Sequence, residues 1–215
     1  MLPAYPLRRR ALLAGAAGFV AATALPTRAH AAVPPPDIDS TQEWGARPPS
    51  GTITILDRRP QMIIIHHTVS PNTSDFSRAQ AHAHAHWVQD LHMDDNGWID
   101  TGYHFVNSRG GYVTEGRHES LGTLTAGYGL VLGAHTSGQN YVGLGIANEG
   151  SYHDGAVPPQ TQWDSLVDIC AYACQQYQIP PTEIYGHMDF VSTLCPGILH
   201  DMLPQLRDEV AHRLG

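Results

Sequence analysis

Four separated residues have side chains suited to hold and use one metal ion: His66, Tyr103, His187 and Cys195. His66 ends the apolar run 62–66, whereas His187 and Cys195 lie eight residues apart near the end of the chain. Two imidazoles and one thiolate suit Zn²⁺, and three protein ligands leave the fourth position open, as in catalytic zinc sites. On its own Tyr103 indicates no function, because a tyrosine in a strand is usually a core residue. It becomes a candidate site residue only together with the three possible ligands. The set indicates a metal-dependent hydrolase.

Other interpretations of these residues stay open on the sequence alone. A single histidine at a strand end, such as His66, is more often a hydrogen-bonded core residue than a ligand. Successive residues of a strand point to opposite faces, so only one of His66 and His67 can face the site. Cys195 could instead be a nucleophile with His187 as its base, which would make a cysteine hydrolase. That alternative leaves His66 and Tyr103 unexplained.

Hydrophobic patterning predicts the elements that position these side chains. The uninterrupted apolar run 62–66 predicts a buried strand, and 77–92 predicts a helix with Ala79, Ala83, Trp87 and Leu91 along one face. Further predicted elements are a hairpin of 103–106 and 112–114, a strand over 142–147, a helix through 163–177, a short strand over 183–186 and a closing helix over 202–214. Residues 116–140 are rich in glycine without a clear period, which predicts an irregular loop. Interleaved strands and helices predict a single α/β domain, a mixed central β-sheet with packed helices.

The first 31 residues have the pattern of an export signal. Three arginines at 8–10 precede an apolar run over 11–25 and the small-residue cleavage pattern Ala29-His30-Ala31. The run is too short for a stable membrane anchor. The arginine pair favours the twin-arginine type over an ordinary secretory signal. We therefore predict a secreted protein with a signal at 1–31, a proline-rich linker at 32–39 and the domain proper at 40–215.

The charge of the chain argues against a nucleic-acid partner. The formal net charge is −8 and lysine is absent; residues 1–31 hold four arginines and no acidic residue, so their removal leaves −12. Nucleic-acid binding requires a basic patch, which this composition does not offer. A mature stretch of roughly 180 residues suits one domain with a sizeable core. We expect a monomer without an integral membrane span.

The remaining cysteines and histidines have structural explanations. Cys170 and Cys174, four apart on a predicted helix, point poorly for a disulfide, so two buried small side chains are favoured over a bridge. His82, His84 and His86 invite a second metal site, but only His82 and His86 share a helix face and no third ligand is evident, so surface histidines are favoured. Glu119 is favoured as a solvated loop residue over a carboxylate that supports the metal ligands.

Six sequence blocks in order resemble one family. They are Trp44–Arg47, Ile64–Thr68, Gly97–Phe105, Glu115–Arg117, Gly133–Thr136 and Gly186-His187 through Cys195-Pro196-Gly197. Together they resemble the peptidoglycan recognition protein and type 2 N-acetylmuramoyl-L-alanine amidase family, which includes the phage T7 lysozyme amidase. The resemblance covers about residues 40 to 213 and rests on the six blocks together.

The resemblance implies a role for each site residue. By position, the ligands of one Zn²⁺ are His66, His187 and Cys195, and Tyr103 and Thr193 are catalytic. Non-catalytic members typically lose the cysteine ligand, so its presence favours activity. The implied substrate is peptidoglycan, cut at the amide between the lactyl group of N-acetylmuramic acid and L-alanine.

Two further histidines are candidates for contact with that substrate. His67 and His135 are the candidates for binding the muramyl peptide, with a packing or supporting role as the alternative. The loop 118–132 looks longer than is usual in the family, which places the rim of the substrate groove in question. The functional alternative is a module that binds muramyl peptide without cutting it.

Overall fold

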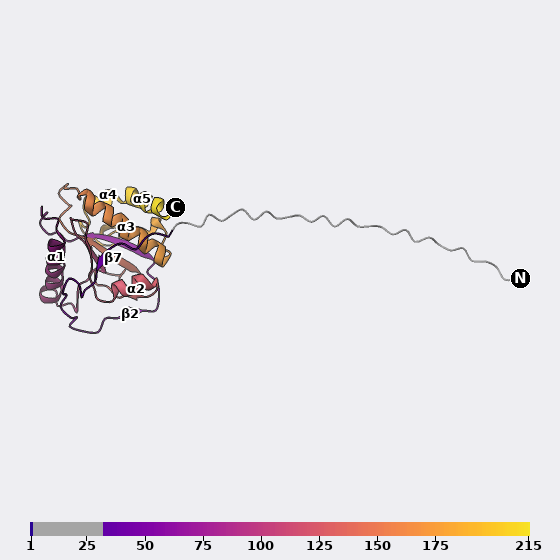
Figure 1. The fold of residues 1–215 in the computed structure, drawn as a ribbon, viewed down its shortest axis with the longest axis horizontal. Coiled ribbons are helices and arrows are strands. Elements are labelled where there is room, and N and C mark those ends of the chain that lie inside the picture. The colour runs from indigo at the N-terminus through magenta and orange to yellow at the C-terminus, as the bar shows by residue number, and fades with distance from the viewer. Residues whose placement is uncertain (2–31) are drawn as a thin grey trace.

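A six-stranded mixed sheet forms the centre of the molecule. The computed structural model describes Met1 and residues 32–215 (Figure 1). The strand order is β1-β5-β4-β7-β3-β8, and the strands are β1 (Ile38–Asp39), β3 (Met62–His67), β4 (Phe105–Asn107), β5 (Val113–Glu115), β7 (Gly143–Asn148) and β8 (Ile184–Gly186). Only β4 and β5 pair antiparallel, as the predicted hairpin requires, and the other neighbours run parallel. The predicted mixed sheet is confirmed.

The neighbouring strands β3 and β7 are almost completely buried. Ile63, Ile64 and Ile65 of β3 are fully buried, as expected of a strand covered on both faces. In β7 every residue is buried, and glycines at 143 and 145 alternate with Leu144 and Ile146. Parallel pairing places His66 of β3 opposite Ala147 of β7.

Helices cover the sheet and enclose the core. The long α3 (Gln160–Tyr177) packs against α5 (Leu203–Leu214), which follows the short α4 (Ile198–Asp201), and the three lie together in Figure 1. Their apolar side chains join those of β3 and β7 in one cluster. Cys170 and Cys174 of α3 are free and buried, which confirms the prediction made for them.

The predicted apolar face of α1 (Arg78–Asp90) is wrong. Ala83 is exposed and Trp87 is 41% exposed, whereas Ala81, Ala85 and Val88 are buried. The alternating Ala-His sequence gives little apolar contrast, so hydrogen bonding decides which face turns inward. Buried polar residues on the inner face are bonded, as buried polar groups must be.

Two buried polar side chains show how α1 is held. The side chain of Gln89 accepts from Arg47 N (2.9 Å) and donates to Asp100 Oδ1 (2.9 Å). His84, favoured as a surface histidine, is only 5% exposed. Beyond α1 the chain continues as a π-helical turn, η1 (Leu91–Asp95).

The predicted loop 116–140 contains regular structure. It folds into α2 (Ser120–Ala126) and β6 (Leu130–Val131), which pairs with β2 (Ile55–Leu56) in a second small sheet. Glycine at 127 ends α2 in the left-handed conformation, at φ 64°. Both α2 and β6 are too short, and the surrounding residues too rich in glycine, to show a hydrophobic period. For this reason the sequence predicted no element here.

The segment 32–39, predicted as a linker, belongs to the fold. Val33 is 8% exposed and its backbone N–H donates to Gln175 Oε1 at 3.0 Å. Ile38 and Asp39 pair with β5 as an edge strand. Backbone hydrogen bonds therefore fix this segment against the sheet. The predicted export signal lies outside the described residues apart from Met1, and no described helix is long and apolar enough to cross a membrane.

Candidate metal centre

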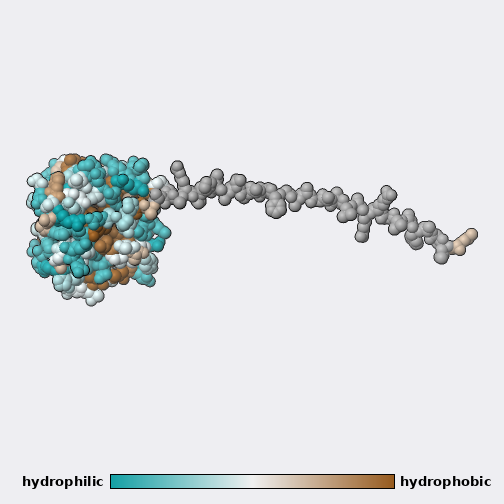
Figure 2. Space-filling view, viewed as in Figure 1, coloured by the Kyte–Doolittle hydropathy of each residue, from teal (hydrophilic) through white to brown (hydrophobic). Residues whose placement is uncertain are grey.

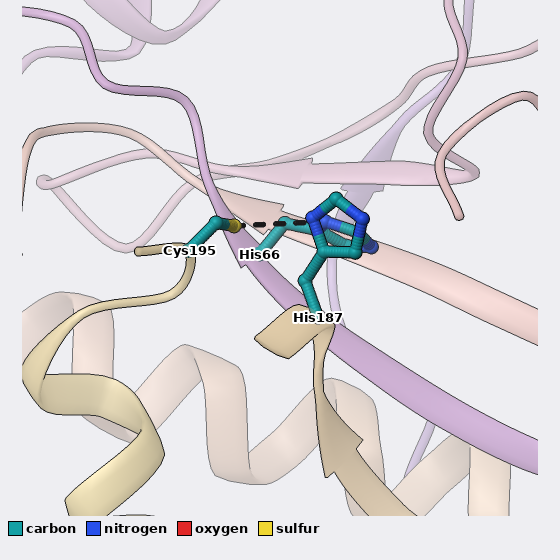
Figure 3. Close-up of side chains that lie close together, drawn as sticks. All are labelled: His66, His187 and Cys195. Atoms are coloured by element: carbon teal, nitrogen blue, oxygen red, sulfur yellow. Dashed lines mark hydrogen bonds between the residues drawn. The ribbon is translucent and has the colours of Figure 1, made fainter. Parts of the chain in front are cut away.

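Three side chains converge at the ends of two neighbouring strands. Ile65 of β3 lies opposite Gly186 of β8, so the next residues, His66 and His187, emerge side by side. Their ring centroids are 4.5 Å apart. Cys195, in the loop before α4, completes the group with its Sγ 3.7 Å from His66 Nδ1 (Figure 3). One ligand atom from each residue lies within 4.8 Å of the others, the only such group among the described residues.

The backbone around Cys195 fixes the position of its sulfur. The Sγ accepts a hydrogen bond from His67 N at 3.3 Å, and Cys195 N donates to Thr193 Oγ1 at 3.2 Å. Gly197 has φ 68°, and a Cβ there would collide with the backbone of Tyr152. Only glycine therefore allows the loop to pass this closely. Burial raises the pKa of the Cys195 thiol to about 12.

The two histidines of the candidate metal site differ in exposure. His66 is fully buried, and burial followed by the neighbouring imidazoles keeps its pKa well below the ordinary value. His187 is half-buried, and burial lowers its pKa as well. Both are therefore neutral near pH 7, the form in which imidazole binds a metal. The accessible side of the group is the side of His187.

Tyr103 lies against the ligand group. Its ring centroid is 5.1 Å from that of His66 and 5.2 Å from that of His92. Burial, and next the nearby Cys195, raise the pKa of the Tyr103 hydroxyl, so the hydroxyl keeps its proton at neutral pH. Among the described residues no hydrogen-bond partner is found for it. The side chain can therefore donate a hydrogen bond to a bound molecule.

The two predicted substrate-binding histidines are both buried. His67 is 2% exposed, and its Nδ1 accepts from Tyr152 N at 3.0 Å. His135 is 7% exposed and lies against the ligand His66, with 3.0 Å between His135 Nδ1 and His66 Nε2. The placement of His135 favours the supporting role that the sequence left as an alternative.

Cavities flank the ligand group. One of about 250 Å³ is lined by residues adjacent in sequence to the ligands, including Met188 and Leu194, together with Tyr152 and His153. Leu194 is 67% exposed. A larger cavity of about 450 Å³, lined by Tyr185, Phe190, Leu203 and Arg207 among others, contains none of the three ligands.

Sequence reasoning missed two residues that support His66. Asn148, at the end of β7, donates through Nδ2 to His66 O at 3.0 Å. Gly145 of β7 leaves room for the ring of His135, since a Cβ at this position would lie 2.6 Å from that ring. Glycine inside a buried strand signals a close approach of another group, and this signal was present in the sequence.

Comparison with known proteins places the chain among related domains. Residues 56–198 match the family model described as N-acetylmuramoyl-L-alanine amidase. The N-acetylmuramoyl-L-alanine amidase of Homo sapiens is 35% identical over 174 residues, 78% of this chain but 28% of that protein. Peptidoglycan-recognition protein SC1a of Drosophila melanogaster is 32% identical over 74% of this chain and 78% of its own length. The chain thus spans little more than a quarter of the human relative and most of the insect one.

Solved structures agree with the sequence comparison. A variant of Drosophila PGRP-LB in complex with tracheal cytotoxin superposes with a TM-score of 0.64 at 27% identity, covering 74% of this chain and 88% of that one. Wild-type PGRP-LB gives the same TM-score and identity. The predicted fold is confirmed by these neighbours.

Proposed function

The chain belongs to the N-acetylmuramoyl-L-alanine amidase family, and on that premise we propose that it is a zinc-dependent amidase of peptidoglycan. Its proposed substrate is the amide between the lactyl group of N-acetylmuramic acid and L-alanine. The observation that carries the proposal is the convergence of His66, His187 and Cys195 beside the protonated hydroxyl of Tyr103. A recognition-only protein has no need of such a combination.

The donor set fits zinc by its chemistry. Two neutral imidazoles and one thiol that can be deprotonated supply the nitrogen and sulfur ligands that Zn²⁺ prefers, and three of them leave one position open. When bound, zinc supplies Lewis-acid polarisation of a carbonyl and a water-derived nucleophile at neutral pH. His66, His187 and Cys195 would hold it.

Residues of the chain itself supply the remaining steps. The Tyr103 hydroxyl, held protonated, orients the attacking group or passes a proton to the leaving amine. Thr193 accepts from Cys195 N and so keeps its own O–H free to donate to the oxygen on which negative charge develops. His67, which packs on Tyr152 and His153 beside the smaller cavity, supports the wall on the accessible side.

The rival cysteine hydrolase fits the geometry less well. It requires His187 to take the proton of Cys195, yet the imidazole nitrogen hydrogen-bonded to Sγ is His66 Nδ1, at 3.7 Å. It also gives no role to Tyr103. The zinc amidase accounts for all of these contacts.

The proposal includes export from the cell and a monomeric state. The arginines and apolar run of residues 8–25 support export, and we propose a twin-arginine signal ending near residue 31. An exported monomer would meet peptidoglycan directly. Residues 32–39, fixed to the sheet, would then form part of the mature domain.

Digestion of purified peptidoglycan tests the proposal. Mass spectrometry should show free stem peptides that begin with L-alanine and glycan strands that remain intact. Elemental analysis should show about one zinc per chain, and removal of the metal should abolish the release. Tyr103→Phe should keep the zinc and muramyl-peptide binding, while the rate falls by roughly 10²–10⁴-fold. Full activity of the metal-free protein would refute the zinc mechanism, and binding without release by the wild type would identify a recognition module.

A further inference from the structure

His135 makes three contacts that define where its proton lies. Its Nε2 is 3.2 Å from Gly143 O, and its Nδ1 is 3.0 Å from His66 Nε2 and 3.0 Å from Thr136 Oγ1. A carbonyl oxygen only accepts, so His135 Nε2 carries a hydrogen and donates it to Gly143 O. Within residues 32–215, no carboxylate is found in contact with the ring to stabilise an imidazolium in this buried position. Nδ1 of His135 is therefore an acceptor.

The acceptor at His135 Nδ1 determines the tautomer of His66. If His66 Nε2 carried no hydrogen, two lone pairs would face each other across 3.0 Å, with only the Thr136 hydroxyl proton to share between them. With a hydrogen on Nε2, His66 donates to His135 and its Nδ1 carries the lone pair that can bind a metal. This Nδ1 is the atom hydrogen-bonded to Cys195 Sγ at 3.7 Å.

The position of the His135 ring is itself fixed from several sides. The backbone N–H groups of His135 and Thr136 both donate to Asn140 Oδ1, at 2.9 and 3.0 Å. The ring lies in a space that Gly145 and Gly133 leave open, because a Cβ on either would lie within 2.8 Å of it. The surrounding backbone therefore fixes the position of the His135 imidazole.

We propose that His135 is a positioning residue that holds His66 as the Nε2–H tautomer and so presents Nδ1 to the metal. This proposal rests on the proposed zinc site but concerns a residue outside the group His66, His187 and Cys195. Partners that hold the second nitrogen of a ligating histidine typically change metal affinity by roughly 10–100-fold when they are removed. His135 thus belongs to the metal centre and not to the substrate groove.

Tautomers and metal affinity test the proposal separately. In metal-free wild type, long-range ¹H–¹⁵N spectra of the imidazoles should show both His66 and His135 protonated on Nε2. An Nδ1–H form of His66 would overturn the proposal. This measurement needs neither zinc nor activity, so it stands even if the wild type proves to bind no zinc, in which case the proposed function fails on its own.

Substitution supplies the second measurement. His135→Leu should weaken zinc binding, measured by chelator competition, by roughly 10–100-fold. His135→Asn, whose side chain can place an amide oxygen near the position of Nδ1, should recover part of the loss. The matched control His84→Leu also removes a buried imidazole, but one that contacts no ligand, and should leave zinc affinity unchanged. Wild-type affinity in a folded His135→Leu protein, or no recovery with Asn, would overturn the proposal.

Discussion

The metal centre and the outer side of α1 organise polar groups in opposite ways. At the centre, His66, His135 and the sulfur of Cys195 are buried and uncharged in the metal-free protein, and His66 contacts His135 at 3.0 Å and the sulfur at 3.7 Å. At the end of α1, Arg47 contacts Asp90 of α1 at 2.8 Å and Asp94 of η1 at 2.7 Å, with side chains that are 42–56% exposed. Figure 2 shows the mainly hydrophilic surface of which such pairs are typical. Burial strengthens each hydrogen bond at the centre and makes an unpaired polar group there costly, whereas solvent weakens the charged pairs.

The largest effect should come from the ligand that the centre depends on most. Cys195→Ser replaces a thiol, which a metal deprotonates outright, by a hydroxyl that stays protonated near neutral pH. Zinc content and hydrolysis should be lost together, while muramyl-peptide binding survives. Zinc content is measured by elemental analysis, and hydrolysis by the release of stem peptides, on one preparation of the protein.

The matched control for that substitution is Cys174→Ala. Cys174 is buried in α3 and contacts none of the ligands, so zinc should be retained. An inactive Cys195→Ser protein with full zinc occupancy would instead support the cysteine nucleophile.

A smaller effect should appear as the pH falls. Burial lowers the pKa of His84, His92 and His104 to about 4, whereas an unfolded histidine titrates near pH 6.5. Between these values the unfolded chain binds more protons than the folded chain, so stability declines as the pH falls. The contribution of each of these imidazoles to stability should be complete above about pH 6.5 and decrease by roughly a few kcal/mol toward pH 4.

Urea unfolding of the metal-free protein at a series of pH values measures this decline. His84→Gln removes one of these titrating groups and should make the decline shallower. A free energy of unfolding that stays constant between pH 7 and 5 would show that these imidazoles are not held neutral by the fold.

The smallest effect should come from the charged surface. Arg47→Ala removes contacts to Asp90 and Asp94 that are exposed to solvent, and such pairs contribute little to stability. The free energy of unfolding should change little, and zinc affinity should not change. A larger loss of stability would contradict the distinction drawn between the buried contacts of the metal centre and the exposed charged pairs. Denaturation in low and high salt would then reveal whether charge is responsible, because salt screens exposed pairs.

The sequence predicted the parts of the molecule that depend on local pattern. The apolar run of β3, the helix α3 and the hairpin β4–β5 were identified, because each carries its own periodicity or turn signal. The convergence of His66 with His187 and Cys195 was anticipated from residue types together with the family resemblance. Strand register then explains it, since Ile65 pairs with Gly186.

The sequence did not predict features that depend on distant contacts. The inner face of α1 is set by Gln89 bridging Arg47 and Asp100, which no periodicity reveals. The supporting position of His135 depends on Gly145, which lies ten residues later in β7. The two-residue strands β1 and β6 lie below the length at which alternation can be recognised.

The separation of the ligands along the chain has a consequence for biosynthesis. Cys195 follows His66 by 129 residues, so the ribosome adds the sulfur ligand long after the first imidazole. A nascent chain, or one terminated before residue 195, therefore lacks a ligand. If the proposed activity holds, such a truncated product is harmless to the wall of the cell that makes it, and hydrolytic capacity arises only after Cys195 has been added.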